Sequence, residues 1–361
     1  MSVIKAEIRM SSNDVRDDIS FFTDRLGMQM DMIYPADDPQ VVVFSGHGVR
    51  LRLDREATEI PGTLRILTDA PETFANGDRV LIAPNGLRVE VDVSCPPLEI
   101  PDPVHSFVVR RLDDEDPWII GRAGMHYRDL VPTRLGGALI ASHIRIPIGG
   151  PVPDMVHFHR VGFQLIFCIH GWVDVLYEDQ GGVRRLTSGD CFIQPPEIRH
   201  KVMSASDDCQ VIEIGVPSDH ITEIDHEMTL PTQEFKPDRE WFGQRFVHNK
   251  ASDSVWDIDY LPGFVGRDTT ISANTGGKAG VHVFRACKGV PKWTTQDAEI
   301  FFCYILNGYL SLETEKQTHN IAKGDAFVVP PKMRTRLNRL SEDIEILVVT
   351  LPGTYTPWVE E

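Results

Sequence analysis

Apolar and polar residues alternate in many short runs of this chain, and a period of two predicts β-strands. From Met125 onward these runs follow one another closely, with glycine and proline between them: GALIASHIRIP, FQLIFCIHG, VDVLYE and CQVIEIGV. Dense short strands separated by turn residues are typical of closed antiparallel barrels. The pattern therefore predicts a mainly β protein.

The N-terminal segment has a different pattern. Residues 4–10 alternate like a strand, and residues 13–27 carry apolar side chains at helical spacing before a terminal glycine. Strand-like runs follow at residues 29–34, 40–45 and 49–53. This β-α-β-β-β order predicts a small α+β domain. A shortened second set of strands follows it, in the runs GTLRILTD, RVLIAP and NGLRVEVDV.

The last third of the chain repeats the pattern of the middle third. Gly308 aligns with Gly171 and Gly324 with Gly189, and a Pro-Pro pair then follows at the same spacing in both copies. The repeat predicts two similar barrels in tandem. We predict three domains, at residues 1–95, 124–220 and 241–361, and two linkers, at residues 96–123 and 221–240.

Composition narrows the range of partners and compartments. The formal net charge of −17 over 361 residues argues against binding to nucleic acid or to anionic membranes. No apolar run reaches transmembrane length, and the N-terminus lacks a signal-peptide pattern. The six cysteines are scattered without CxxC spacing, which favours reduced thiols. We expect a cytoplasmic protein.

Metal-binding residue types gather between positions 157 and 200. His157 and His159 are two residues apart, so on a strand both side chains point to the same face. Gln164 follows five residues later, and His200 follows after an apolar hairpin. Three imidazoles and an amide oxygen suit a divalent first-row metal. Core histidines bonded to the backbone are the alternative, and the complete set favours the metal.

The spacing H-x-H-x4-Q-x6-G, followed by G-x5-P-x4-H, resembles the paired motifs of the cupin superfamily. In that family three histidines and one glutamate hold a metal inside a small jelly-roll-like β-barrel. The resemblance implies the ligands His157, His159, Gln164 and His200, with Gln164 where glutamate is usual. Four neutral ligands leave the metal its full charge, which favours Lewis-acid chemistry or an anionic substrate. With the repeat, the resemblance implies a bicupin.

The second barrel lacks these ligands. On the repeat alignment the four positions become Thr294, Gln296, Phe301 and Thr335. We therefore expect one divalent transition metal per chain and none in the second barrel. The role expected for that barrel is packing, a barrel-to-barrel interface or a homo-oligomer contact.

One metal-binding and one degenerate barrel resemble the arrangement of gentisate and related ring-cleaving dioxygenases, which hold Fe(II) on neutral histidines. The resemblance implies a ring-cleaving or carbon–carbon-cleaving dioxygenase with Fe(II), acting on a small anionic metabolite; Mn, Ni and Zn are alternatives. The same scaffold also hosts lyases, isomerases and hydrolases. A non-catalytic metabolite-binding module is the other alternative, and a polar site kept in an apolar barrel favours an enzyme.

No catalytic residue is assigned, and four side chains are candidates for substrate binding: His143, Arg145, Tyr177 and Arg199. Either arginine suits a bidentate contact with a substrate carboxylate. His143 and Arg145 share one face of a strand. That face is either the barrel interior, beside the metal, or a solvated exterior, and the pattern does not choose between them.

The N-terminal segment resembles one module of the vicinal oxygen chelate (glyoxalase-like) superfamily, and a shortened second module follows. The resemblance implies metal ligands on the first strand of each module and near the end of the last strand. Those positions are Lys5, Gly62 or Thr63, and Glu90. One carboxylate does not make a metal site. We expect a metal-free structural or interaction domain.

Overall fold

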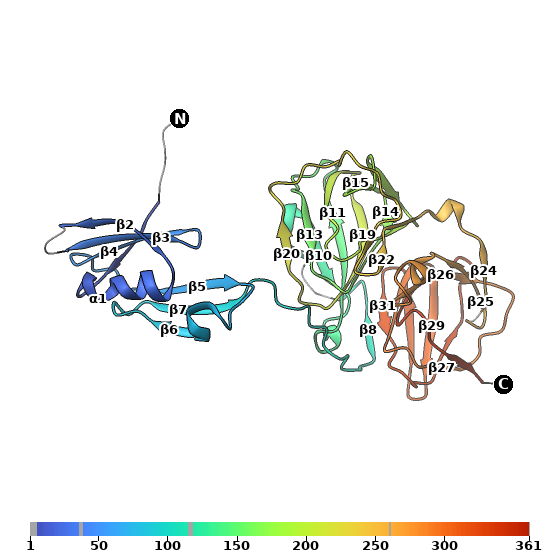
Figure 1. Cartoon of the computed structure of the whole chain (residues 1–361). Coiled ribbons are helices and arrows are strands. Elements are labelled where there is room, and N and C mark those ends of the chain that lie inside the picture. The colour runs from blue at the N-terminus through green and yellow to red at the C-terminus, as the bar shows by residue number, and fades with distance from the viewer. Residues whose placement is uncertain (1–5, 36–38, 115–117, 260, 361) are drawn as a thin grey trace. The chain divides into compact units, whose positions relative to one another are not determined.

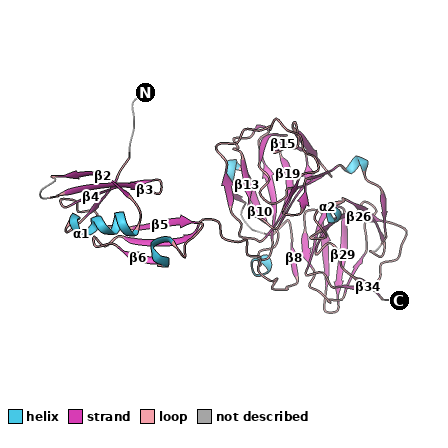
Figure 2. Ribbon diagram, in the orientation of Figure 1, coloured by secondary structure: helices cyan, strands magenta, loops and turns pink. Residues whose placement is uncertain are grey.

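The computed structural model describes residues 6–35, 39–114, 118–259 and 261–360. Strands dominate it, which confirms the predicted mainly β class (Figure 2). The chain forms two compact units, Met1–Pro97 and Leu98–Glu361 (Figure 1). Among the described residues, no helix has the length and apolar character needed to cross a bilayer.

The first unit contains helix α1 (Val15–Ser20), which continues as one wider turn to Arg25. The strands in the described part of this unit are β1 (Ile8–Ser11), β2 (Gln29–Tyr34), β3 (Val41–Gly46), β4 (Val49–Asp54), β5 (Thr63–Thr68), β6 (Val80–Ile82) and β7 (Arg88–Val93). One sheet has the order β1-β4-β3-β2 and the other β5-β7-β6. Strand β1 is parallel to β4, and β5 is parallel to β7.

This unit folds around one apolar layer. The Asp14 side chain caps α1 by accepting a hydrogen bond from the backbone N–H of Arg16 at 3.0 Å. Phe22 then stacks on Phe44 of β3, with ring centroids 5.0 Å apart. The predicted β-α-β-β-β order is the order observed.

Of the expected glyoxalase-type ligand positions, Lys5 lies outside the described residues. Glu90 accepts a hydrogen bond from Arg88 Nε at 2.9 Å on the same strand. Gly62 has no side chain, and Thr63 is exposed where β5 begins.

The second unit contains two barrels, each made of two sheets. The strands of the first barrel are β9 (Ile119–Ile120), β10 (His126–Asp129), β11 (Ile140–Ile146), β12 (Gly150–Pro151), β13 (His157–His159), β14 (Phe163–His170), β15 (Trp172–Tyr177), β16 (Arg184–Thr187), β17 (Cys191–Ile193), β18 (His200–Ala205), β19 (Cys209–Val216), β20 (Thr222–Ile224) and β23 (Val247–Asn249). One sheet runs β23-β17-β14-β19-β11-β10-β9, and the other runs β16-β15-β18-β13-β20 with β12 beside β18.

The strands of the second barrel are β8 (Val108–Arg110), β24 (Trp256–Ile258), β25 (Phe264–Asp268), β26 (Gly280–Ala286), β27 (Thr294–Gln296), β28 (Ile300–Asn307), β29 (Tyr309–Thr314), β30 (Thr318–Ala322), β31 (Ala326–Val328), β32 (Thr335–Asn338), β33 (Glu345–Leu351) and β34 (Pro357–Val359). Its sheets run β24-β25-β26-β33-β28-β31-β8 and β30-β29-β32-β27-β34. The unit also contains a short hairpin, β21 (Glu240–Trp241) with β22 (Gln244–Arg245), and the single-turn helix α2 (Ile271–Asn274).

The two barrels have the same register. His157 lies opposite His200 in the first barrel, and Thr294 lies opposite Thr335 in the second. The turn glycines match in conformation as well, because Gly189 and Gly324 have φ values of 92° and 90°. These positive values favour glycine. The repeat alignment predicted from the sequence is therefore the structural alignment.

Both barrels take strands from outside their predicted boundaries. In the first barrel these include β9 and β20, which lie in the segments 96–123 and 221–240 that were expected to be linkers. Strand β8 lies within the segment 96–123, expected to be a linker, and pairs with β31 of the second barrel. Strand β23 lies within the segment 241–361, expected to be the second barrel, and pairs with β17 of the first. One apolar cluster includes buried side chains of both barrels, among them Phe167 and Phe302. The barrels thus share a continuous core.

Candidate metal centre

Strand geometry brings three histidines together. His157 and His159 occupy alternate positions of β13, and His200 begins β18 opposite His157. Their ring centroids lie 4.2 Å apart for His157–His200 and 5.2 Å apart for each of the other two pairs. One ring nitrogen from each lies within 4.8 Å of the other two, and all three side chains are buried.

The second nitrogen of each ring has a protein partner. His157 Nδ1 lies 2.8 Å from the backbone oxygen of Met155, and His200 Nδ1 lies 2.9 Å from that of Ile198. A carbonyl only accepts, so Nδ1 of both rings carries the proton and Nε2 keeps its lone pair. His159 Nδ1 lies 2.8 Å from Thr222 Oγ1. These contacts orient all three rings as metal-binding histidines are oriented, with Nε2 as the ligand atom.

The rings are held in the neutral state. Burial lowers the pKa of His157, His159 and His200 below the ordinary histidine value, and the positive charge of Arg122 lowers the pKa of each ring further. A neutral imidazole is the form that ligates a metal. The three side chains therefore fit a divalent transition metal.

Arg122, which the sequence did not suggest, lies against this triad. Its Nη2 is 3.0 Å from His157 Nε2, and because arginine only donates, that nitrogen accepts. The same guanidinium pairs with the buried Asp154, whose other oxygen accepts from the backbone N–H of Val202 at 2.9 Å. Arg122 stands in a short turn within the expected linker, where no motif marks it.

Gln164 lies inside the barrel next to a carboxylate. It shares one face of β14 with Ile166, which lines the cavity. Its Nε2 donates to Glu213 Oε1 at 2.6 Å, which leaves the carbonyl oxygen buried with no hydrogen-bond partner among the described residues. Such an oxygen is costly unless something binds it. An amide carbonyl oxygen is a suitable metal ligand. The assignment of Gln164 as the fourth ligand stays a prediction.

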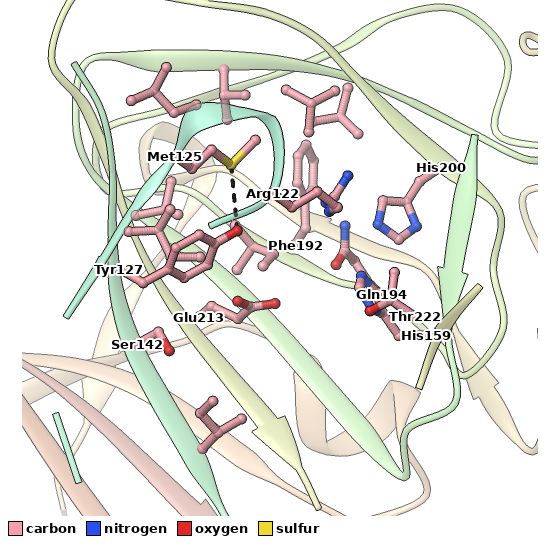
Figure 3. A pocket seen from close by; sticks show the side chains of 18 of the residues that line it. Arg122, Met125, Tyr127, Ser142, His159, Phe192, Gln194, His200, Glu213 and Thr222 are labelled. Carbon is pink, nitrogen blue, oxygen red and sulfur yellow. Dashed lines mark hydrogen bonds between the residues drawn. The ribbon is translucent and has the colours of Figure 1, made fainter. Parts of the chain in front are cut away.

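The triad opens onto a cavity of about 450 Å³ with mostly apolar walls. In the view of Figure 3, His159 and His200 lie on one side, and Tyr127 and Ser142 lie on the other. Tyr177, one of the four substrate-binding candidates, also lines the cavity. Its ring stacks on His200 with centroids 5.6 Å apart.

The hydroxyl of Tyr177 accepts a hydrogen bond from Gln194 Nε2 at 2.8 Å. Burial raises the pKa of Tyr177 well above its usual value, so the phenol stays neutral. Gln194 and His220 line the cavity as well. Sequence reasoning did not select either residue.

Two further candidates, His143 and Arg145, do not reach the cavity. On β11 the cavity side belongs to Ser142 and Ile144, so the alternate residues point to the opposite face. His143 is buried there against Tyr304 of the second barrel, and burial lowers its pKa to about 4. Arg145 pairs with Asp208. The strand pattern left open which face is inside, and neither of these two substrate-binding candidates lies on the cavity side.

Arg199 is the fourth candidate, and it also lies away from the cavity. Its Nε is 3.3 Å from Asp225 Oδ2, and its guanidinium lies 4.0 Å from the ring centroid of Phe158. Although it precedes His200, strand alternation turns the two side chains to opposite faces. The arginine that lines the cavity is Arg122.

The interior of the second barrel is much smaller. A cavity of about 30 Å³ lies among the residues equivalent to the four predicted ligands. Gln296 there donates to the backbone oxygens of Val329 and Pro330, and Phe301 fills the position of Gln164. The amide of Gln296 is thus used in hydrogen bonds within the barrel, and Phe301 offers no ligand atom.

Comparison with known proteins identifies the architecture. A family model described as the EutQ-like cupin domain matches residues 281–344, which belong to the second barrel. Salicylate 1,2-dioxygenase from Pseudaminobacter salicylatoxidans is similar in structure, with 15% identity over 72% of this chain and 90% of that chain and a TM-score of 0.51. The chain has the cupin fold. The jelly-roll-like barrels predicted from the sequence are thereby confirmed.

Two other structural neighbours have different names. A variant of oxalate decarboxylase from Bacillus subtilis has 11% identity over 72% of this chain and 81% of that chain, with a TM-score of 0.52. Protein Ylba from E. coli has 13% identity over 71% of this chain and 94% of that chain, with a TM-score of 0.50. At such identities the likeness shows the fold alone. Comparison with curated protein sequences gives no match.

Proposed function

We propose that this chain is a metal-dependent cupin enzyme whose first barrel holds one divalent ion and a small organic acid. One observation carries the proposal. Three neutral histidines, each held at Nδ1 by hydrogen bonding, turn their Nε2 atoms toward one another, and His159 and His200 line a mostly apolar cavity. A divalent ion in that set supplies Lewis-acid chemistry and, when it is Fe(II), redox chemistry.

Arg122 binds the acid in this proposal. Of the lining side chains that the structure describes, it is the one arginine or lysine. It now donates to His157 Nε2, the atom that a metal needs. With a metal held by His157 Nε2, Arg122 would lose this acceptor and would be free to donate to the substrate carboxylate. The ion pair with Asp154 would hold the guanidinium at this end of the cavity.

The reaction class we favour is ring-cleaving or carbon–carbon-cleaving dioxygenation, in which a carbon–carbon bond breaks and both oxygen atoms of O2 enter the product. The fold similarity to salicylate 1,2-dioxygenase supports it, and one of those structures contains gentisate. The apolar walls and the volume of about 450 Å³ suit an aromatic or branched acid. An acid with almost no apolar surface, such as oxalate, leaves those walls unused, so decarboxylation is the second candidate.

Oxygen uptake by the Fe(II)-loaded protein tests this function. We expect uptake with at least one of gentisate, salicylate and an aliphatic β-diketo acid, and none with His200→Ala. Arg122→Gln should raise KM at least about ten-fold with a smaller effect on kcat, because it removes a charge that binds the acid. A parallel assay of CO2 release from oxalate by the Mn(II)-loaded protein tests decarboxylation. Binding of these acids without turnover in either assay would favour the non-catalytic module.

For the first unit we propose a glyoxalase-like module followed by a shortened copy, without a metal. The order β1-β4-β3-β2 with parallel β1 and β4 supports this, since β5-β7-β6 repeats the parallel contact with one strand fewer. Glu90 is paired with Arg88, and a single carboxylate makes no site. A metal content of two per chain, with one ion surviving loss of the histidines, would contradict this assignment.

A further inference from the structure

One part of the cavity wall carries three polar side chains to which the proposed function assigns no contact with the substrate. Tyr127, Ser142 and Glu213 come from β10, β11 and β19, which are neighbours in one sheet. Ser142 lies directly opposite Glu213, and Tyr127 lies opposite Ile144, the next cavity-lining residue of β11. Side chains so placed stand close together on one face. Figure 3 shows the three on the side of the cavity away from His200.

These three side chains have hydrogen-bonding capacity to spare. Glu213 Oε1 accepts from Gln164, and no described residue donates to Oε2. Ser142 is a buried residue that lines the cavity, and no described residue forms a hydrogen bond with its hydroxyl. The Tyr127 hydroxyl contacts the sulfur of Met125 at 3.8 Å, a weak acceptor. Burial and the charge of Glu213 raise the pKa of Tyr127 to about 12, so it remains a donor.

The surrounding wall is apolar. Ile144, Ile166 and Val211 lie beside the three polar groups, in sheet positions next to them. A carboxylate oxygen without a donor in such surroundings is destabilising, and a ligand group that donates to it removes that cost. Glu213 is also the one carboxylate among the described lining residues.

We propose that Tyr127, Ser142 and Glu213 form a second subsite, which binds a hydrogen-bond donor on the substrate. This inference rests on the proposed function, since it concerns the acid held at the metal. The substrate class is a small organic acid with an apolar body and, at the far end, a hydroxyl or an ammonium group. Glu213 Oε2 accepts from that group, and the two hydroxyls complete its hydrogen bonds.

The charge of Glu213 separates the two donor types. An ammonium forms an ion pair with the carboxylate, whereas a hydroxyl forms a hydrogen bond that an amide oxygen also accepts. Glu213→Gln keeps the shape and removes the charge. It should therefore abolish a preference for the ammonium and leave much of a preference for the hydroxyl.

The test is calorimetric titration of the full chain loaded with Zn(II), which is not redox-active. The probes are hexanoate, 6-hydroxyhexanoate and 6-aminohexanoate, which differ only at the far end and are flexible. We expect at least one substituted acid to bind about ten-fold or more tightly than hexanoate. Glu213→Ala should remove that advantage, and Ser142→Ala and Tyr127→Phe should each reduce it. Ser311→Ala, at a buried serine of the second barrel, is the matched control and should have no effect.

Equal affinities for the three acids, or no binding by any of them, would overturn the subsite. So would an advantage that survives Glu213→Ala, Ser142→Ala and Tyr127→Phe alike. Repeating the titrations after metal removal separates the two proposals. A donor preference that persists while the affinity of all three acids is independent of the metal contradicts the proposed function and supports the subsite. Metal-dependent binding without a donor preference contradicts the subsite and supports the proposed function.

Discussion

Thr222 is the side chain that orients one of the three histidines. His157 and His200 bond through Nδ1 to backbone oxygens, which no substitution removes, whereas His159 bonds to the Thr222 hydroxyl at 2.8 Å. Outer partners of this kind fix the ring and its tautomer. Thr222 therefore allows the orientation of a ligand to be changed without changing the ligand.

Thr222→Val should weaken metal binding by about ten-fold, because valine keeps the volume and removes the hydrogen bond. Competition with a chromophoric chelator measures the affinity. Thr294→Val, in the corresponding barrel wall of the repeat, is the control and should leave it unchanged. Equal affinities of parent and Thr222→Val would mean that His159 needs no such support.

Glu213 changes the outcome expected of a carboxylate at position 164. From the ligand pattern alone, Gln164→Glu should keep or tighten metal binding, since it adds an opposite charge. In the structure Gln164 Nε2 lies 2.6 Å from Glu213 Oε1, so the substitution sets two carboxylates against each other. The pKa of one of such a pair rises. No sequence pattern marks this contact, because β19 lies far from β14 in the chain.

We therefore expect metal-free Gln164→Glu to be less stable than the parent at pH 8, by about 1 to 3 kcal/mol. A raised folded-state pKa means that the folded state binds the extra proton first, so the deficit should shrink as the pH falls toward 5. The double variant Gln164→Glu/Glu213→Gln restores one amide and one carboxylate and should recover the stability. Thermal unfolding at both pH values measures this. No recovery in the double variant would show that the contact does not cause the loss.

Local spacing explains which site residues the sequence revealed. His157, His159 and His200 follow from strand alternation and from the turns of one hairpin, which the chain encodes over short distances. Arg122, Asp154 and Glu213 come from a turn, a loop and a distant strand, and only the barrel brings them together. Their residue types are common on solvated surfaces, so nothing in the sequence marks them as interior.

Strand β11 illustrates what alternation leaves undecided. A period of two predicts that His143 and Arg145 share a face and that Ser142 and Ile144 share the other, and it does not say which is inside. The usual clue is an exposed polar face, and here it fails, because Tyr304 of the second barrel covers His143. His143, a substrate-binding candidate in the sequence, is thus part of the contact between the two barrels.

The burial of His143 predicts a pH-dependent stability. Its folded-state pKa is about 4, and its ordinary value is 6.5. The unfolded chain therefore binds the proton first on acidification, so the contribution is fully present above pH 6.5 and is lost as the pH falls toward 4. The loss is on the order of 3 kcal/mol over that range.

His143→Gln should flatten the fall in unfolding free energy between pH 7.5 and 5, compared with the parent. Chemical denaturation at several pH values measures the slope. Some slope should remain, because burial also lowers the pKa of His248 to about 4. Identical slopes for parent and variant would mean that His143 is protonated without cost in the folded protein.

The strands β8 and β23 show why the domain boundaries were harder to predict than the barrels. Each is three residues long, and each completes a sheet of the barrel to which its segment was not assigned. A run of three residues is too short to show the alternation of apolar and polar positions that predicts a strand. An edge strand forms its hydrogen bonds with the sheet that it joins. The residues of the strand itself therefore do not show which sheet that is.

Over the whole chain, the internal repeat predicted more of the fold than any single motif did. Turn glycines and apolar runs recur in both halves of the second unit, and the two barrels share one register and a continuous core. The fold thus depends on the recurring features, whereas the chemistry depends on a few positions that do not recur. Thr294 and Thr335 keep the strand pairing that His157 and His200 have, without their ligand atoms.

Metal content by elemental analysis tests the central claim most directly. The parent chain, loaded with Fe(II) or Zn(II) and freed of excess ion, should hold about one metal per chain. His157→Ala and His200→Ala should each hold almost none while remaining folded, and Thr294→Ala and Thr335→Ala should match the parent. Retention of the metal by His157→Ala and His200→Ala, or its equal loss from both sets of variants, would contradict a single site in the first barrel.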